Sequence, residues 1–234
     1  MKKKMYLCPL MESVTSKKNI RVRIGKLLLK IKAAAYSLFN LRDLIHVVRL
    51  RNQYEGIQLR PAELIKIFRA IGKFEKCNML VFGLGYDSPF WCKANGNGRT
   101  AFLEDFQPWF DKITAMYPEI EAYAVSYHNN ITQWREVLDQ PGQLAVKLPV
   151  EVPLHNWDLV LVDGPRGHQF KEEIPGRMSS IYTASQLVGK NGYVFVHDAE
   201  RIVESAYATK YLGRDHFVEK VRGRALLHIY HFPD

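Results

Sequence analysis

Cysteine is scarce in this chain of 234 residues, and the three cysteines form no pair at a redox or zinc-binding spacing. Cys8, Cys77 and Cys92 lie far apart and no CxxC occurs, which argues against a disulfide framework and a cysteine-based zinc site. The residues before Cys8 are not an apolar stretch ending in small residues, so we expect neither a lipoprotein anchor nor a signal peptide. The sequence therefore predicts a protein of a reducing compartment, the cytoplasm.

Long uncharged runs are missing as well. No window of 18 residues is without a charged side chain, so we expect no transmembrane segment. Low-complexity tracts are also absent, and a hydrophobic content of 47% is enough to build a core. The length suits one α/β domain with a modest extension.

The net charge of +9 is concentrated at the N-terminus. Residues 1–51 hold 13 Lys or Arg and two acidic residues, a net charge of +11, whereas the remainder holds 20 basic and 22 acidic residues, a net charge of −2. A protein that binds nucleic acid needs basic residues around its cleft, and here the body of the chain is near neutral. We therefore expect no nucleic-acid partner.

Residues 19–51 carry apolar side chains at alternating spacings of three and four, which is typical of an amphipathic helix. The stripe consists of Leu27, Ile31, Ala34, Leu38, Leu41, Ile45 and Val48. Such a helix packs against the domain or a partner subunit, or, since basic residues flank the stripe, it binds an anionic membrane surface peripherally. We divide the chain into residues 1–55, a basic leader and helical arm, and residues 56–234, the main domain. The oligomeric state is left open.

Apolar runs alternate with helical patterns along the main domain. Helices are expected at residues 60–74, 109–116, 131–138 and 176–187, and strands at 78–83, 101–104, 122–125, 157–162, 192–196, 217–221 and 226–231. This alternation predicts a doubly wound, mostly parallel sheet. The last two strands flank Gly223 and predict a terminal antiparallel hairpin, which is the usual signature of the Rossmann-like class I methyltransferase sheet of seven strands.

The first strand stops abruptly at Gly83-Leu84-Gly85, and Glu104 follows Gly83 by 21 residues at the end of the next apolar run. Glycines here let a backbone approach a ligand, and a carboxylate about 20 residues later is placed to accept hydrogen bonds from ribose hydroxyls. The third glycine of the dinucleotide pattern is missing, since position 88 is Ser88. The spacing therefore favours S-adenosylmethionine over NAD.

Polar residues follow two further strands. Asp163 ends the strand at 157–162, and His197-Asp198 ends the strand at 192–196. In open α/β sheets ligands bind outside the carboxyl ends of the strands, where the strand order reverses. These residues are thus expected to converge on one crevice with the glycine loop and Glu104.

Five segments together carry a resemblance to a known family. They are CNMLVFGLGYDSPFW, NGRTAFLED, WDLVLVDGPRG, PGRMSSIYTA and VFVHDAERIVE. Over roughly residues 60–232 the chain resembles the polysaccharide-biosynthesis family whose characterised plant members are glucuronoxylan 4-O-methyltransferases, with arabinogalactan glucuronic acid methyltransferases as relatives. The resemblance implies transfer of a methyl group from S-adenosylmethionine to a sugar hydroxyl of a polysaccharide, in first place the 4-hydroxyl of glucuronic acid.

The resemblance also assigns roles at the cofactor end. Glu104 would hold the ribose hydroxyls, and Tyr127 and His128, after the third strand, would flank the adenine. Gly83 and Gly85 would pass beside the methionine part of the cofactor, and Leu84 and Asp163 are also expected to bind the cofactor.

A sugar hydroxyl is a poor nucleophile at neutral pH, so the site must accept its proton or polarise it. In one scheme Asp163 or His197 is the general base. In the other, a divalent metal ion held by Asp163 and Asp198 lowers the pKa of the hydroxyl. Ala199 follows Asp198 where the metal-dependent catechol-type pattern has Asn, which favours the base.

A uronic acid acceptor needs a guanidinium for its carboxylate, because Arg binds carboxylates bidentately. Arg166 and Arg177 are the candidates, with Trp91, Tyr86 and Tyr182 as aromatic surfaces for sugar rings. Two alternatives remain open: methylation of another sugar, such as a rhamnose of a surface glycan, and a non-catalytic biosynthesis factor. A nucleic-acid methyltransferase is disfavoured, since the strand before Asp163 continues as DGPR rather than as a base-binding NPPY or DPPW turn.

Overall fold

A computed structural model describes residues 41–154 and 156–234. Residues His46–Asp234 form one compact unit, which carries the sheet. Residues 41–51 of the predicted arm are helical, and the rest of the arm lies outside the described residues. The sheet-bearing unit starts before the predicted boundary at residue 56, because Val47 and Leu50 are buried in its core.

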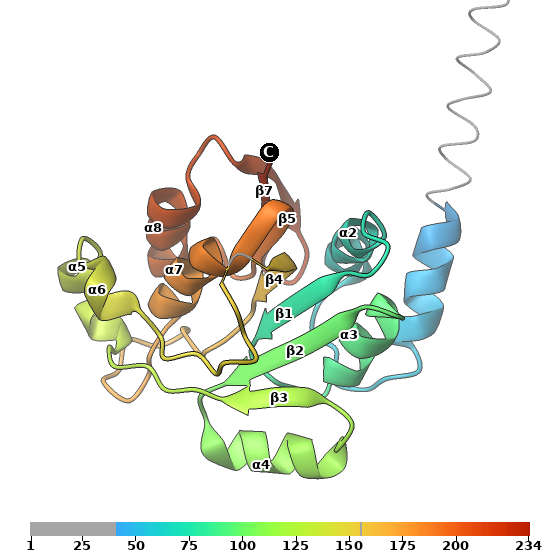
Figure 1. Ribbon diagram of the computed structural model, residues 1–234, viewed down its shortest axis with the longest axis horizontal. Helices are drawn as coiled ribbons and strands as arrows, with labels where there is room; N and C mark the ends of the chain where they lie inside the picture. Colours follow the sequence, from blue (N-terminus) through green and yellow to red (C-terminus); the bar gives the residue numbers. More distant parts are fainter. Residues whose placement is uncertain (1–40, 155) are drawn as a thin grey trace, which may run out of the picture. The chain divides into compact units, whose positions relative to one another are not determined.

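Seven strands form one sheet in the order β3-β2-β1-β4-β5-β7-β6 (Figure 1). They are β1 (Asn78–Phe82), β2 (Arg99–Glu104), β3 (Glu121–Ala124), β4 (Trp157–Val162), β5 (Val188–Val196), β6 (Phe217–Arg222) and β7 (Leu226–Phe232). The pairs β1–β2, β2–β3, β1–β4 and β4–β5 are parallel, and β7 runs antiparallel to both β5 and β6. This order confirms the predicted class I methyltransferase fold with its terminal antiparallel hairpin.

Helices cover both faces of the sheet. One set is α2 (Pro61–Ile71), α3 (Ser88–Asn95) and α4 (Gln107–Met116); the other is η1 (Ile131–Gln133), α5 (Trp134–Val137), α6 (Pro141–Leu144), α7 (Met178–Leu187), α8 (Ile202–Tyr207) and the π-helical η2 (Ala208–Leu212). Helices α3, α6, α8 and η2 were not predicted, although a proline in the first turn marks the start of α3. No helix in the described part of the chain has both the length and the apolar character to cross a membrane.

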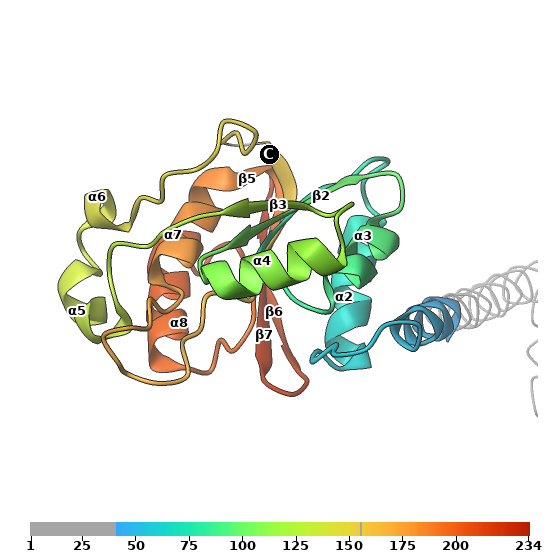
Figure 2. The ribbon, with the colours of Figure 1, turned by 90° about the horizontal axis from the view of Figure 1, so that it is seen from below.

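Helices lie on both sides of the sheet (Figure 2), and alternate side chains along a strand belong to two different hydrophobic cores. Leu80 and Phe82 of β1 pack with α7, α8 and the segment from η1 to α6, whereas Met79 and Val81 pack with α2, α3 and α4. Successive side chains of a strand point to opposite faces, so a parallel strand between two helical layers is apolar throughout. Every residue of β1 from Met79 to Phe82 is accordingly buried.

The strand order reverses between β1 and β4: β2 and β3 lie on one side of β1, and β4 and β5 lie on the other side. Their ends meet at two glycines: a Cβ on Gly164 would lie 2.8 Å from the Gly83 Cα and 2.9 Å from its nitrogen. Gly83 also adopts a φ of +109°, which residues with a side chain rarely tolerate. The glycine loop thus serves first to let two backbones touch at the switch point where ligands bind in such sheets.

The contact between the glycines predicts that Gly164→Ala lowers the free energy of unfolding by about 1–3 kcal/mol, because the new methyl group meets fixed backbone. Gly142→Ala is the matched control, since nothing lies within 4 Å of its Cβ position. Denaturant unfolding of both variants measures the effect. Equal stability of the two variants would contradict the close contact.

Candidate active site

A cavity of about 900 Å³ opens at the carboxyl ends of β1, β2, β4 and β5. This is within the size range of ligand sites. Eleven of the predicted site residues line it: Gly83, Leu84, Gly85, Tyr86, Trp91, Glu104, Asp163, Arg166, Arg177, His197 and Asp198. Its remaining wall includes residues before α2 and the turn between β6 and β7, which are far from the strand ends in sequence.

Glu104 connects the end of β2 to the glycine loop. Its Oε2 accepts the Leu84 N–H at 2.9 Å and its Oε1 accepts the Phe106 N–H at 3.0 Å. The side chain is buried, and these two amides orient the carboxylate at the cavity wall. Each carboxylate oxygen accepts more than one hydrogen bond, so acceptor capacity remains for two ligand hydroxyls.

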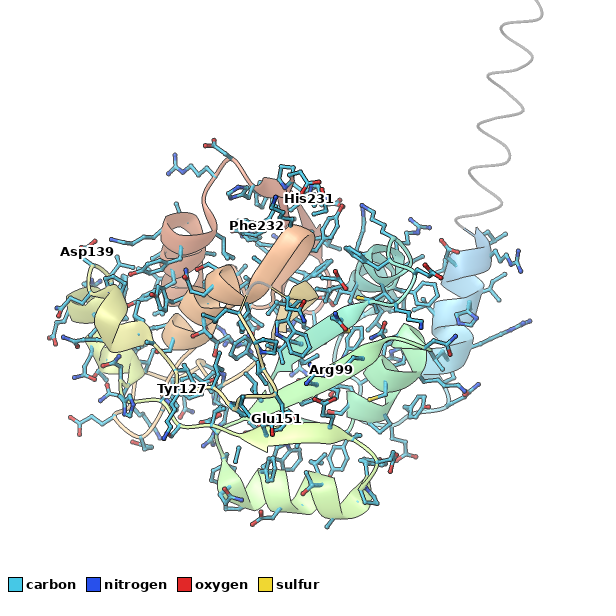
Figure 3. All side chains as sticks on the ribbon, in the orientation of Figure 1. Arg99, Tyr127, Asp139, Glu151, His231 and Phe232 are labelled. Atoms are coloured by element: carbon cyan, nitrogen blue, oxygen red, sulfur yellow. The ribbon has the colours of Figure 1, made fainter. Side chains whose placement is uncertain are left out.

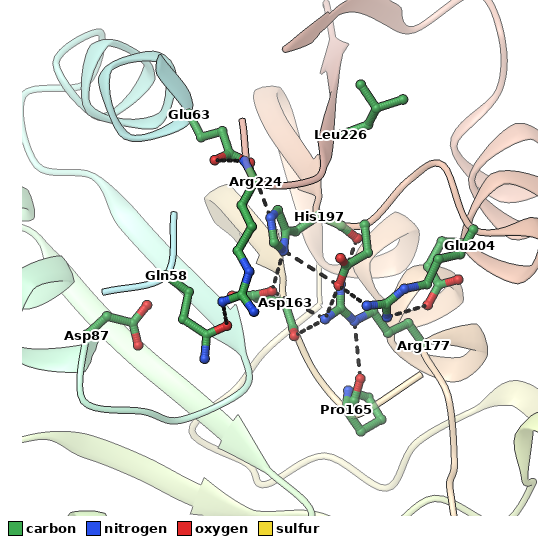
Figure 4. A network of polar contacts seen from close by, with 12 residues as sticks. Gln58, Glu63, Asp87, Asp163, Pro165, Arg177, His197, Glu204, Arg224 and Leu226 are labelled. Carbon is green, nitrogen blue, oxygen red and sulfur yellow. Dashed lines mark hydrogen bonds and ion pairs between the residues drawn. The ribbon is translucent and has the colours of Figure 1, made fainter. Parts of the chain in front are cut away.

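A chain of charged groups lies behind the other wall (Figure 4). His197 Nδ1 is 2.9 Å from Asp163 Oδ1, and its Nε2 is 3.2 Å from Oε1 of Glu63, a fully buried residue of α2. His197 is itself buried, whereas the Asp163 side chain keeps 28% of its surface exposed. Of these three charged side chains, Asp163 is therefore the one that a ligand in the cavity can reach.

The pKa values of the pair move in opposite directions. Burial opposes the charged form of His197, but the hydrogen bond to Asp163 and the charges of Asp163 and Asp198 outweigh burial and raise its pKa. Burial likewise opposes ionisation of Asp163, but the hydrogen bond from His197 and the charge of Arg177 lower its pKa. At neutral pH Asp163 is thus held as a carboxylate.

Arg177 is saturated by contacts within the protein. Its Nε donates to the Pro165 carbonyl at 3.1 Å, Nη1 to the His197 carbonyl at 2.7 Å and Nη2 to the Asp163 carbonyl at 2.5 Å. Nη2 also lies 3.0 Å from Asp198 Oδ2 and 3.3 Å from Asp163 Oδ1. This replaces the prediction that Arg177 binds a substrate carboxylate: the guanidinium instead ties the ends of β4 and β5 together.

Asp163, His197 and Asp198 offer ligand atoms within 4.8 Å of one another. Two guanidinium groups already occupy this cluster, since Arg177 contacts both carboxylates and Arg201 Nη2 lies 2.8 Å from Asp198 Oδ2. A divalent ion would bring two further positive charges against these arginines. The donor set as arranged therefore does not fit the predicted metal site.

Three predicted residues lie outside the cavity lining: Tyr127, His128 and Tyr182. Tyr127 (labelled in Figure 3) places its hydroxyl 2.9 Å from Ser180 of α7, and His128 is exposed to solvent. The Tyr182 ring packs edge-on against Tyr211. We therefore withdraw Tyr127 and His128 from the adenine site and Tyr182 from the sugar site.

Trp91 lines the cavity but is only 1% exposed, and its ring packs on Phe90. Tyr86, which also lines the cavity, is partly exposed and meets Trp109 edge to face. Trp91 therefore offers no open surface to a sugar ring, and Tyr86 stays a candidate.

Sequence reasoning missed several residues of the site. Asp87 lies at the start of α3 and accepts the Trp91 indole N–H at 3.1 Å. Burial, followed by the charge of Asp163, raises its pKa to about 6. Asp87 lies two residues after Gly85 in the segment GLGYDSPFW, so its proximity to the glycines could have identified it as a site residue. Glu63 and Arg224 carry no such signal, because only the tertiary fold brings them to the strand ends.

The sequence pattern of the IRX15/IRX15L/GXM family matches residues 62–230, which include every strand but the last two residues of β7. The chain belongs to the IRX15/IRX15L/GXM family. Among relatives, glucuronoxylan 4-O-methyltransferase 1 of Arabidopsis thaliana is 36% identical over 177 residues, covering 67% of this chain and 62% of the relative. Arabinogalactan O-methyltransferase 1 of the same plant is 34% identical over 199 residues, covering 75% and 66%.

The chain thus spans just under two thirds of the length of both named relatives of the family. A solved methyltransferase structure from Geobacter sulfurreducens is 12% identical, with a TM-score of 0.46 over 83% of this chain and 89% of that chain. The strand order of the sheet, β3-β2-β1-β4-β5-β7-β6, identifies the fold.

The saturation of Arg177 predicts that Arg177→Ala lowers the free energy of unfolding by about 3–5 kcal/mol, because buried carboxylates and carbonyls lose their partner. Arg166→Ala is the control: this residue is exposed and stacks on the Phe106 ring with its guanidinium 5.1 Å from the ring centre. We expect a change within about 0.5 kcal/mol for it in denaturant unfolding. Wild-type stability of Arg177→Ala would restore Arg177 as a free substrate ligand.

The raised pKa of Asp87 predicts a pH-dependent effect of Asp87→Asn. The folded state binds the proton more tightly than the unfolded state, so the contribution of Asp87 is fully present near pH 4 and is lost as the pH rises through about 6. Relative to wild type, Asp87→Asn should gain on the order of 1 kcal/mol of stability between pH 4 and pH 7.5. Unfolding at several pH values measures this gain, and a difference independent of pH would refute it.

Proposed function

We propose that this protein is an S-adenosylmethionine-dependent O-methyltransferase that acts on a sugar hydroxyl of a polysaccharide, with the 4-hydroxyl of glucuronic acid as the leading acceptor. The observation that carries the proposal is the convergence of Glu104 and Asp163 on one cavity at the switch point of a class I methyltransferase sheet. Support for the acceptor comes from the family relatives, whose names specify glucuronoxylan and arabinogalactan.

The cofactor would lie along the ends of β1 and β2. Glu104, oriented by the Leu84 and Phe106 amides, accepts hydrogen bonds from the two ribose hydroxyls. Phe106 lines the cavity beside Glu104 and is 47% exposed, so its ring replaces Tyr127 and His128 as the surface offered to the adenine. When bound, S-adenosylmethionine supplies a methyl group on a sulfonium, which is activated for in-line attack.

Asp163 would receive the proton of the acceptor hydroxyl. Its carboxylate is ionised and partly exposed in the cavity, whereas His197 and Arg177 hold it from behind. Methyl transfer from the bound cofactor to the sugar oxygen would leave a neutral thioether, and Asp163 would take up the proton that the hydroxyl releases. The lowered pKa makes Asp163 a weak base, so positioning of the hydroxyl supplies much of the rate.

The remaining predictions concern the place of action. We propose a cytoplasmic protein in which the basic arm, residues 1–55, makes peripheral contact with an anionic membrane. The net charge of +11 on residues 1–51 supports this proposal.

Labelled S-adenosylmethionine and glucuronoxylan oligosaccharides test the function directly. We expect transfer of label to the uronic acid at an unchanged rate in EDTA, since Arg177 and Arg201 already neutralise the carboxylate cluster. Asp163→Asn should lower kcat by about 10²-fold or more, because the proton acceptor is lost. Glu104→Gln should instead weaken cofactor binding, measured by calorimetry.

Three results would contradict the proposal, one for the acceptor, one for the absence of a metal and one for catalysis. Transfer to another glycan but not to the uronic acid would sink the acceptor assignment. Loss of activity in EDTA would show that the reaction depends on a divalent metal ion. Absence of cofactor binding would favour the non-catalytic alternative.

A further inference from the structure

Four arginines line the cavity, and they differ in what they already bind. Arg177 is saturated, and Arg201 pairs with Asp198 at 2.8 Å and with Glu204 at 3.7 Å. Among the described residues, neither Arg166 nor Arg224 has a carboxylate within ion-pair distance of its guanidinium. Arg166 stacks on Phe106, beside the proposed cofactor site. Arg224 is thus the cavity arginine that is neither paired with a carboxylate nor stacked beside the proposed cofactor site.

The turn that carries Arg224 is anchored to α2. Its backbone N–H donates to Glu63 Oε2 at 3.2 Å, and the preceding Gly223 leaves no room for a side chain, since a Cβ there would lie within 2 Å of the same oxygen. Glu63 is fully buried and also contacts His197. One carboxylate therefore positions both the turn and the histidine behind Asp163.

The Arg224 side chain is pre-oriented as well. Its Nη1 donates to Gln58 Oε1 at 2.6 Å, and both residues line the cavity. Figure 4 shows the side chain running from Glu63 past His197 toward Gln58. Gln58 occupies one N–H of the guanidinium and leaves others for a ligand, so less conformational entropy is lost when a ligand binds.

A cation on this wall favours the binding of an acidic acceptor. Asp163 and Asp87 both line the cavity, and a guanidinium that has no carboxylate partner lessens their repulsion of an anionic sugar. Arg binds a carboxylate through two parallel hydrogen bonds, whereas a neutral hydroxymethyl group offers it no such pairing.

We propose that Arg224, held in place by Gln58 and Glu63, binds the carboxylate of the acceptor sugar, so that the site selects a uronic acid over its neutral counterpart. This inference rests on the proposed function and assigns to Arg224 the role that the sequence had suggested for Arg177.

The test compares one oligosaccharide in two forms, with its uronic acid intact and with the carboxyl group reduced to the alcohol. For Arg224→Gln in the full chain we expect KM for the uronate form to rise about 10- to 100-fold, the value for loss of a charge-assisted pair. Turnover of the reduced form and the affinity for S-adenosylmethionine should not change. Gln58→Ala should raise the same KM by a smaller factor.

Arg222→Gln is the matched control, since it removes the same charge from the same hairpin at an exposed residue outside the cavity lining. An unchanged preference for the uronate in Arg224→Gln would overturn the proposal, and so would an equal loss of turnover on both acceptor forms. Failure of the wild-type protein to methylate either form would instead count against the proposed function. If Arg224→Gln does not fold, Gln58→Ala decides through the same ratio of KM values.

Discussion

The site depends on the buried guanidinium of Arg177. It donates to three carbonyls and contacts the carboxylates of Asp163 and Asp198, so it joins the ends of β4 and β5 at the level of the cavity. Two carboxylates this close would repel each other in a poorly solvated place, and one would take up a proton. Arg177 offsets this repulsion, and its charge, after the hydrogen bond from His197, helps to lower the pKa of Asp163.

A second carboxylate extends this network beyond the strand ends. Glu63 comes from α2, yet it contacts His197 on one oxygen and the backbone of Arg224 on the other. A buried charge is costly unless it is paired and hydrogen-bonded. Glu63 Oε2 accepts hydrogen bonds from the Arg60 and Arg224 N–H groups, and its Oε1 lies 3.2 Å from His197 Nε2. The antiparallel hairpin characteristic of the fold is thereby connected to the wall of the cavity that carries His197 and Asp163.

The site residues at the ends of the parallel strands were predictable from the sequence. Gly83, Glu104, Asp163 and the pair His197-Asp198 each stand at the end of an apolar run, and parallel strands bring such ends to one edge of a sheet. Tyr127 and His128, which follow β3, do not line the cavity, and the Tyr127 hydroxyl contacts Ser180 of α7. A strand end indicates an edge of the sheet, but not the direction in which the next side chains point.

The sequence by itself determined the sheet, its switch point and the acidic residues there, since period, glycines and spacing are local properties of the chain. The tertiary structure alone decided which charges face each other. Arg166 and Arg177 look equivalent in sequence, but one is exposed at the cavity and the other is enclosed by carbonyls and carboxylates. The sequence does not distinguish Arg224 from other arginines, because the contact of its backbone with Glu63 joins segments that are distant in the chain.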